Sequence, residues 1–172
     1  METGYVQIYT GDGKGKTTAA LGLALRAAGH GLKTYFCQFM KGQSYGELEA
    51  LRDHPSITIE QFGRPECIRR EDVTADDIAR AHRALECARQ AMLSGRYDIV
   101  VLDEINVALW FELLALEEVL AFLAARPRAV ELVLTGRRAP AELVARADLV
   151  TEMQEVKHYY SRGVVSRDGI ER

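Results

Sequence analysis

Cysteine is scarce in this sequence, and the pattern of its three occurrences indicates neither a metal site nor a disulfide framework. Cys37, Cys67 and Cys87 are odd in number and widely spaced, and no CxxC pair is present. The four histidines have no metal-ligand spacing with these cysteines. The sequence therefore suggests neither a structural zinc ion nor an oxidising compartment.

Positive charge and long apolar runs are also missing. The formal net charge is -3 at pH 7, so the chain has no overall field that attracts nucleic acid. We interpret two small basic clusters, Arg69-Arg70 and Arg137-Arg138, as solvated helix ends or loops. No apolar run is long enough to cross a bilayer, and no charged leader precedes the first predicted strand. We expect a cytoplasmic protein that contacts neither membrane nor nucleic acid.

Recognisable protein nucleophiles are missing too, because no Ser-His-Asp or Cys-His arrangement can be placed. What is present is a hydrophobic content of 48% over 172 residues, which is enough to bury one core. No shift in composition, internal repeat or low-complexity segment divides the chain. We predict a single domain over residues 1–172.

A glycine-rich segment is the most informative part of the sequence. Thr10-Gly11-Asp12-Gly13-Lys14-Gly15-Lys16-Thr17-Thr18 stands between a short apolar run and an Ala/Leu-rich helical pattern. In such a strand–loop–helix unit the backbone N–H groups and the lysine bind phosphate oxygens, while the Thr17 hydroxyl can bind Mg²⁺. The segment is a near-match to a Walker A loop, with Thr10 where glycine is usual and Lys14 as an added lysine. We expect Lys16 on an exposed loop.

Two other interpretations of this segment are weaker. A glycine turn that merely caps a helix would not need the Gly-Lys-Thr core. A dinucleotide fingerprint would need glycine at Lys16 and an acidic residue after the second predicted strand, where Gln38-Phe39-Met40-Lys41 stands instead. The segment therefore favours a polyphosphate ligand.

Strand and helix patterns alternate along the chain. Predicted strands cover residues 5–9, 33–39, 57–62, 99–102, 130–134 and 149–153. Predicted helices cover residues 17–28, 47–52, 74–95 with Thr74 as the N-cap, two segments within 105–122, and 140–145. Residues 63–73 are predicted as a loop, and a polar tail follows from Gln154. This order predicts a single-domain α/β fold, a doubly wound and mainly parallel sheet of the P-loop NTPase type, with ligands at the carboxyl ends of the strands.

Two carboxylates follow the most apolar predicted strand. Residues 99–102 run directly into Asp103 and Glu104. In a Walker B arrangement one such acid holds Mg²⁺ while its neighbour works on substrate or solvent. Acids often simply end strands, but the glycine-rich segment is expected at the same sheet edge, so we favour the functional interpretation.

Five separated motifs resemble the P-loop class of ATP:corrinoid adenosyltransferases. They are Gly11–Thr18, Gln38–Gly42, Val101–Asn106, Leu134–Arg137, and Val150–Met153 with Lys157-His158. The resemblance extends to Gly169-Ile170 and implies transfer of the 5′-deoxyadenosyl group of ATP to cobalt(I) of a reduced corrinoid. Triphosphate would be released, in adenosylcobalamin synthesis or salvage. Because the nucleophile of this family is cobalt, the resemblance also explains why the protein shows none.

The resemblance implies roles for individual residues. It assigns catalysis to Lys16 and Glu104, and Mg²⁺ to Thr17, Asp103 and Glu104. It assigns ATP to Gly11, Asp12, Gly13, Lys14, Gly15, Lys16, Thr17 and Thr18, with Gln38, Lys41 and Arg137 as further candidates. Phe62 and Arg64 are assigned to the corrinoid, although the aromatic residues that commonly follow this stretch in the family are missing here. The tail over 154–172 is expected to pack near the site, and the implied partners are a second copy of the chain and a flavoprotein electron donor.

Two other functions remain open at this stage. One is a different phosphate-loop enzyme, either a small-molecule kinase or an NTP hydrolase. The other is a non-catalytic nucleotide switch that binds a partner through residues 41–55 and 63–73. The products separate the three, because only an adenosyltransferase releases triphosphate and an adenosylated corrinoid.

Overall fold

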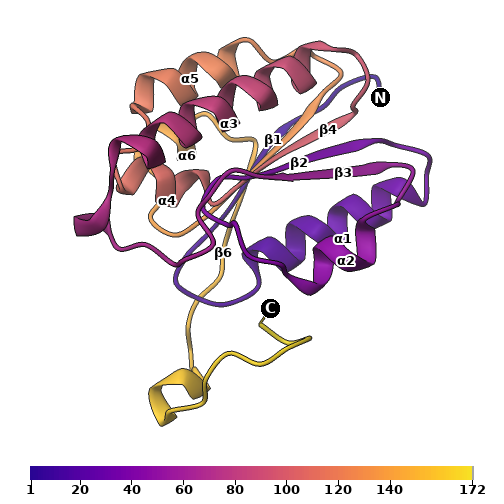
Figure 1. Ribbon diagram of the computed structural model, residues 1–172. Helices are drawn as coiled ribbons and strands as arrows, with labels where there is room; N and C mark the ends of the chain where they lie inside the picture. Colours follow the sequence, from indigo (N-terminus) through magenta and orange to yellow (C-terminus); the bar gives the residue numbers. More distant parts are fainter. Residues whose placement is uncertain (172) are drawn as a thin grey trace.

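Six parallel strands form the central sheet of the computed structural model, which describes residues 1–171 (Figure 1). In chain order they are β1 (Val6–Thr10), β2 (Thr34–Gln38), β3 (Ile57–Gln61), β4 (Ile99–Asp103), β5 (Glu131–Thr135) and β6 (Leu149–Glu152). Across the sheet the order is β3-β2-β4-β5-β1-β6, and every pairing is parallel. All strands therefore end at one edge, which gathers the loops that follow them.

Helices cover both faces of this sheet (Figure 1). One face carries α1 (Lys16–Ala28) and α2 (Gly46–Leu51), and the other carries α3 (Ala75–Leu93), α4 (Ile105–Trp110), α5 (Leu116–Ala124) and α6 (Ala141–Val144). The predicted doubly wound α/β fold is confirmed, and it is consistent with the P-loop NTPase type. Within residues 1–171 no helix is both long and apolar enough to span a membrane.

The predicted strands and helices agree with the structure, and their ends shift by at most two residues. Two short 3₁₀ helices were not predicted: η1 (Arg70–Asp72) within the predicted loop, and η2 (Tyr159–Arg162) within the predicted tail. A single 3₁₀ turn is too short to show a hydrophobic period in the sequence.

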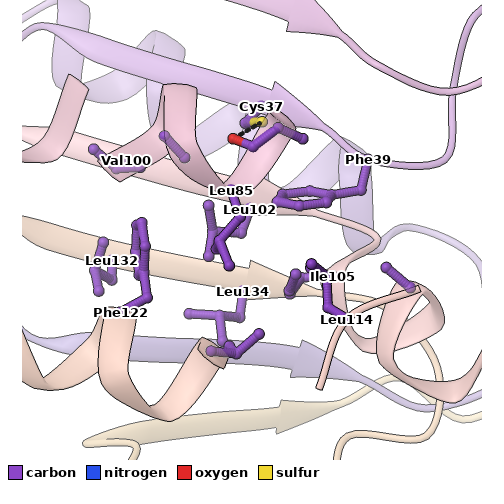
Figure 2. Close-up of a cluster of buried hydrophobic side chains, with 14 of the residues drawn as sticks. Cys37, Phe39, Leu85, Val100, Leu102, Ile105, Leu114, Phe122, Leu132 and Leu134 are labelled. Atoms are coloured by element: carbon purple, nitrogen blue, oxygen red, sulfur yellow. Dashed lines mark hydrogen bonds between the residues drawn. The ribbon is translucent and has the colours of Figure 1, made fainter. Parts of the chain in front are cut away.

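Alternating side chains of the central strands fill two hydrophobic cores. In β4, Val100 and Leu102 pack toward α3 and α5, whereas Ile99 and Val101 pack toward α1. Figure 2 shows the first core, with Leu102 near Leu85 of α3. All five residues of β4 are buried, as predicted for a central parallel strand. This packing holds the carboxyl end of β4 in place.

Thr74 caps α3 as predicted, and the cap also anchors the loop before it. The Thr74 backbone N–H donates to Asp77 Oδ2 at 2.8 Å, while the Asp77 N–H donates to the Thr74 hydroxyl at 3.4 Å, which together form a capping box. Arg64 adds a salt bridge to the same carboxylate, with Nε 2.6 Å from Oδ1. Residues 63–73 are therefore tied to the start of α3.

Candidate functional site

An open cavity of about 640 Å³ lies at the edge where the strands end. Its wall combines the glycine-rich loop, the connection between β2 and α2, the residues after β4 and β5, and part of the C-terminal segment. Four cationic side chains line it, from Lys14, Lys16, Lys41 and Arg137. Three carboxylates, from Glu47, Glu104 and Glu171, line it as well, and the lysines of the glycine-rich loop suit a polyanionic ligand.

The glycine-rich loop folds against the segment that follows β6. The Gly13 N–H donates to Met153 O at 2.6 Å. Gly11 has a φ of +91°, and a Cβ built there would lie 2.4 Å from the same carbonyl oxygen; one at Gly13 would lie 2.7 Å from it. Glycine is needed at both positions because a side chain would collide with this backbone.

Lys16 is buried, which corrects the expectation of an exposed loop lysine. It is 6% exposed, and its Nζ donates to Gly11 O at 2.7 Å and to Gly13 O at 2.6 Å. Burial lowers the pKa of the ammonium, and the nearby carboxylates, Glu104 first, oppose this effect. The loop thus wraps around its own lysine, whose ammonium donates to two of the loop's carbonyl groups.

Asp103 is fully buried at the end of β4, and side chains from several elements donate to it. Its Oδ1 accepts hydrogen bonds from the hydroxyls of Thr17 at 2.9 Å and Thr135 at 2.7 Å. Its Oδ2 accepts one from the Gln38 amide at 3.2 Å and lies 3.3 Å from Lys41 Nζ. The predicted pair of Thr17 and Asp103 is therefore in direct contact, and the carboxylate is compensated as a buried charge must be.

Glu104 lies beside this cluster with an unusual backbone conformation. Its φ is 64°, in the left-handed region, and its N–H donates to Thr135 Oγ1 at 2.9 Å. A Cβ built on Gly136 would lie 3.2 Å from Glu104 Oε2, so glycine leaves room for this side chain. Burial raises the pKa of the Glu104 carboxyl and Asp103 raises it further, while Lys41 and other cations oppose the rise. Strained non-glycine residues of this kind cluster at functional sites.

The connection between β2 and α2 supplies a wall that sequence reasoning found only in part. Lys41 Nζ lies 3.5 Å from Glu47 Oε1 and 5.0 Å from the centroid of the Tyr45 ring. Burial alone would lower the pKa of this ammonium, but Asp103 and Glu47 outweigh it and raise the pKa. Lys41 was a candidate, whereas Tyr45, Glu47 and the Thr135 hydroxyl were not predicted as site residues. Thr135 could have been predicted as a site residue, because it lies at the end of a strand within one of the five motifs. The spacing of Tyr45 and Glu47 in the sequence does not indicate that they belong to the site.

The predicted site residues divide into three groups: those that line the main cavity, those that do not, among them the fully buried Asp103 and Gln38, and those at a separate cavity. Those lining the main cavity are Gly13, Lys14, Gly15, Lys16, Thr17, Thr18, Lys41, Glu104 and Arg137. Asp12 is exposed and does not line it, and Gly11 lies beneath the segment after β6. Phe62 and Arg64 line a separate cavity of about 10 Å³, barely the size of one water molecule.

The loops after β2 and β3 interlock through two glycines. The Gly63 N–H donates to Lys41 O at 3.0 Å. A Cβ built on Gly42 would lie 2.4 Å from Gly63 O, and one built on Gly63 would lie 2.4 Å from Met40 C. The backbone that carries Lys41 is therefore packed directly against the loop that carries Phe62 and Arg64.

The C-terminal segment, yellow in Figure 1, extends beyond the layered body and returns toward the glycine-rich loop. Lys14 Nζ donates to Ile170 O at 2.9 Å and lies 3.3 Å from Glu171 Oε1. Arg167 and the Tyr159 hydroxyl contact the same carboxylate, and these donors, Arg167 first, lower its pKa. This part of the chain thus contributes one side of the cavity.

Within residues 1–171, no group of three or more His, Cys, Asp or Glu side chains is placed to hold a metal ion. Side-chain oxygen atoms that a cation could meet near Thr17 are those of Thr17, Glu104 and Glu47, which line the cavity, and those of Asp103, which is fully buried and contacts Thr17. A hydroxyl and carboxylates are hard ligands of the kind that Mg²⁺ accepts when a phosphate and water complete its shell.

Comparison with known proteins adds a family. The family model described as "ATP:corrinoid adenosyltransferase BtuR/CobO/CobP" matches residues 2–172. A corrinoid adenosyltransferase of Pseudomonas aeruginosa is 38% identical, over 99% of this chain and 84% of the relative. Those of a Sinorhizobium species and of Escherichia coli K12 are 37% and 34% identical, over 99% of this chain and 81% and 86% of the relatives. The similarity therefore extends over the glycine-rich loop, the strand ends and the C-terminal segment alike.

Proposed function

Because the chain belongs to the ATP:corrinoid adenosyltransferase family, we propose that it transfers the 5′-deoxyadenosyl group of ATP to cobalt(I) of a reduced corrinoid. The electron pair of cobalt(I) forms the bond to C5′, while the C5′–O bond of ATP breaks and its electrons leave with triphosphate. The observation that carries this proposal is the cavity with four cations at the strand ends.

Stabilisation of the leaving triphosphate is the main task that we assign to the protein. Negative charge builds on the triphosphate as the C5′–O bond breaks, so fixed cations and N–H groups around it lower the barrier. We assign this role to Lys14, Lys16 and the loop N–H groups of residues 14–18. Lys16 would exchange the carbonyl oxygens of Gly11 and Gly13 for phosphate oxygens, which keeps its donors satisfied in both states.

Thr17 and Asp103 fit a magnesium ion, with Glu104 as a third candidate. The Thr17 hydroxyl oxygen and Asp103 Oδ1 lie 2.9 Å apart, and hard oxygen atoms are the ligands that this ion prefers. When bound, Mg²⁺ supplies charge neutralisation of the triphosphate. Thr135 and Gln38 keep Asp103 oriented through hydrogen bonds at 2.7 and 3.2 Å.

The corrinoid side of the site is proposed around the loop after β3. Phe62 packs against the main core, and Arg64 is held by Asp77 at the start of α3. We assign Phe62 to exclusion of the lower corrinoid ligand and Arg64 to holding the loop. Phe62→Ala should then impair turnover driven by a protein electron donor more than turnover from pre-reduced corrinoid. Equal losses, with a lowered melting temperature, would assign Phe62 to packing alone.

The proposal includes a homodimer, a flavoprotein electron donor and a cytoplasmic location, all implied by the family resemblance. Support for a second copy comes from β6, an edge strand whose residues are all exposed, including Leu149 at 45% and Val150 at 41%. Light scattering on the purified protein tests the dimer. Reduction of bound cobalt(II) by a reduced flavodoxin-like protein tests the donor.

The decisive experiment combines the protein with ATP, MgCl₂ and chemically reduced cobalamin. The expected result is the visible spectrum of an alkylated cobalamin, with triphosphate as the second product and activity lowered by about 100- to 1000-fold in Lys16→Met. Free phosphate or a phosphorylated metabolite would instead identify a hydrolase or kinase. ATP binding without turnover would identify a nucleotide switch.

A further inference from the structure

Lys41 occupies the position in which a divalent cation would meet its protein ligands. Its Nζ lies 3.3 Å from Asp103 Oδ2, 3.3 Å from Thr17 Oγ1 and 3.5 Å from Glu47 Oε1. The face of the Tyr45 ring lies 5.0 Å away on another side. Three oxygen atoms and an aromatic ring form a site for a cation, and the lysine ammonium fills it.

The same ammonium completes the set of donors to Asp103. Two hydroxyls occupy Oδ1, and the Gln38 amide and Lys41 share Oδ2. A divalent ion that binds this carboxylate directly must therefore displace a donor. Of these groups, Thr135 and Gln38 belong to strands, whereas Lys41 stands on a loop and has a four-carbon side chain. Lys41 is the donor that can leave with the least disturbance of the sheet.

The movement required is confined to the side chain. The Lys41 backbone is held by the N–H of Gly63, and Gly42 is packed against the Gly63 carbonyl. The side chain is 16% exposed and lines the same cavity as Lys14 and Lys16. Once released from Asp103, its ammonium stays within reach of an anion in that cavity.

We propose that Lys41 is the built-in counter-cation of the Thr17–Asp103 oxygen pair, which leaves Asp103 when a divalent ion binds and then pairs with the triphosphate. Two cations at the same carboxylate repel each other, so the lysine and the metal compete for Asp103. When no metal is bound, the Lys41 ammonium neutralises the buried Asp103 carboxylate. The second half, pairing with triphosphate, rests on the proposed function, whereas the competition with metal does not.

The test uses Mn²⁺ as the probe, followed by electron paramagnetic resonance on the nucleotide-free full-length protein. Lys41→Met should bind Mn²⁺ at least about tenfold more tightly than the wild type, because the competing charge is gone. Lys41→Arg keeps the charge and should stay within about threefold of the wild type. Lys14→Met removes a cavity charge that does not touch Asp103, and should also stay within about threefold.

Unchanged or weaker Mn²⁺ binding in Lys41→Met would overturn the proposal, and so would equal tightening in Lys14→Met. A melting experiment covers the stability of the variant: Lys41→Met should melt below the wild type without metal and gain more from added Mn²⁺. Equal gains in melting temperature in both proteins would contradict the competition.

With ATP present, Lys41→Met should raise KM for ATP more than it lowers kcat. An unchanged KM would overturn only the second half of the proposal, the pairing of Lys41 with triphosphate. Absence of adenosyl transfer in the wild type would refute the proposed function while leaving the metal result intact.

Discussion

Two carboxylates near the cavity, Asp103 and Glu171, are held by the chain in different ways. Asp103 is fully buried and receives donors from the sheet and the first turn of α1. Glu171 belongs to the C-terminal segment and is met by Lys14, Arg167 and Tyr159. The chemistry of the two clusters is similar, but the Asp103 carboxylate has no exposed surface, whereas the Glu171 side chain is 16% exposed.

The difference shows that the number of partners says little about the strength of such a cluster. A buried charge that loses a partner cannot turn to water, whereas an exposed ion pair exchanges its partner for water at small cost. We therefore expect the sheet side to be a rigid frame for the triphosphate, and the C-terminal side to be a cover that salt loosens. The following variants test this contrast.

The largest effect is expected from Asp103→Ala. Two hydroxyls, one amide and one ammonium lose their acceptor inside the protein, so the free energy of unfolding should fall by about 3–5 kcal/mol. Adenosyl transfer should disappear as well. Urea unfolding and the cobalamin assay measure the two losses. A fall below about 1 kcal/mol would mean that the buried cluster is not stronger than an exposed one.

Lys16→Met and Lys14→Met compare a lysine of each side directly. For Lys16→Met we expect kcat/KM for ATP to fall by about 100- to 1000-fold, as for loss of one preorganised donor to a developing anion. Lys14 already pairs with Glu171 and is more exposed, so its loss should cost about tenfold or less. Steady-state kinetics at low ionic strength provide the measurement. Equal losses would erase the distinction between the two sides.

Glu104→Gln tests how burial affects a carboxylate on the sheet side. We expect the variant to bind ATP but to transfer the adenosyl group more slowly. Because burial first and Asp103 second raise the pKa of Glu104, its ionised form is disfavoured in the folded protein. The wild type should therefore lose stability relative to the variant as pH rises above about 4.3, the ordinary glutamate value. The difference in melting temperature between the two proteins, measured from about pH 4 to about pH 8, would show this loss. A difference that is constant with pH would contradict the burial effect.

The smallest effect is expected from Glu171→Gln. The change removes a carboxylate that competes with phosphate for Lys14, so the affinity for ATP should rise by about two- to threefold at low salt. The increase should vanish at about 0.5 M salt, and the urea midpoint should not move measurably. Titration of ATP at low salt and at about 0.5 M salt measures the two affinities, and urea unfolding measures the midpoint. A salt-independent change would place Glu171 with the buried cluster.

Sequence reasoning was most successful where a function follows from local order. Lys16 and Thr17 end the glycine-rich loop after the first predicted strand, Asp103 and Glu104 follow directly after the fourth, and parallel strands end at one edge. The strands themselves were predictable because buried strands are continuous apolar runs and helices have a period of 3.6 residues. Five motifs in order then pointed to one family, which the comparisons confirm.

Sequence reasoning failed where a feature depends on how a loop or connection folds back on itself in three dimensions. The burial of Lys16 results from a loop that closes on its own carbonyl groups. The approach of Glu47 and Tyr45 to Lys41 depends on how α2 packs beside the sheet. No spacing in the sequence encodes these distances, because they are set by the packing of other side chains.

The sequence by itself determined the α/β class, the order of strands and helices, and the residue types of a polyphosphate site, since these follow from hydrophobic period and from local backbone chemistry. Only the tertiary structure decided which groups share one carboxylate. Thr17, Thr135 and Lys41 are far apart in the chain and meet at Asp103 because parallel strands and their crossovers bring a helix start, a strand end and a loop to one edge. The physical reason is that a buried charge must find its partners in space, and that space is arranged by the whole core.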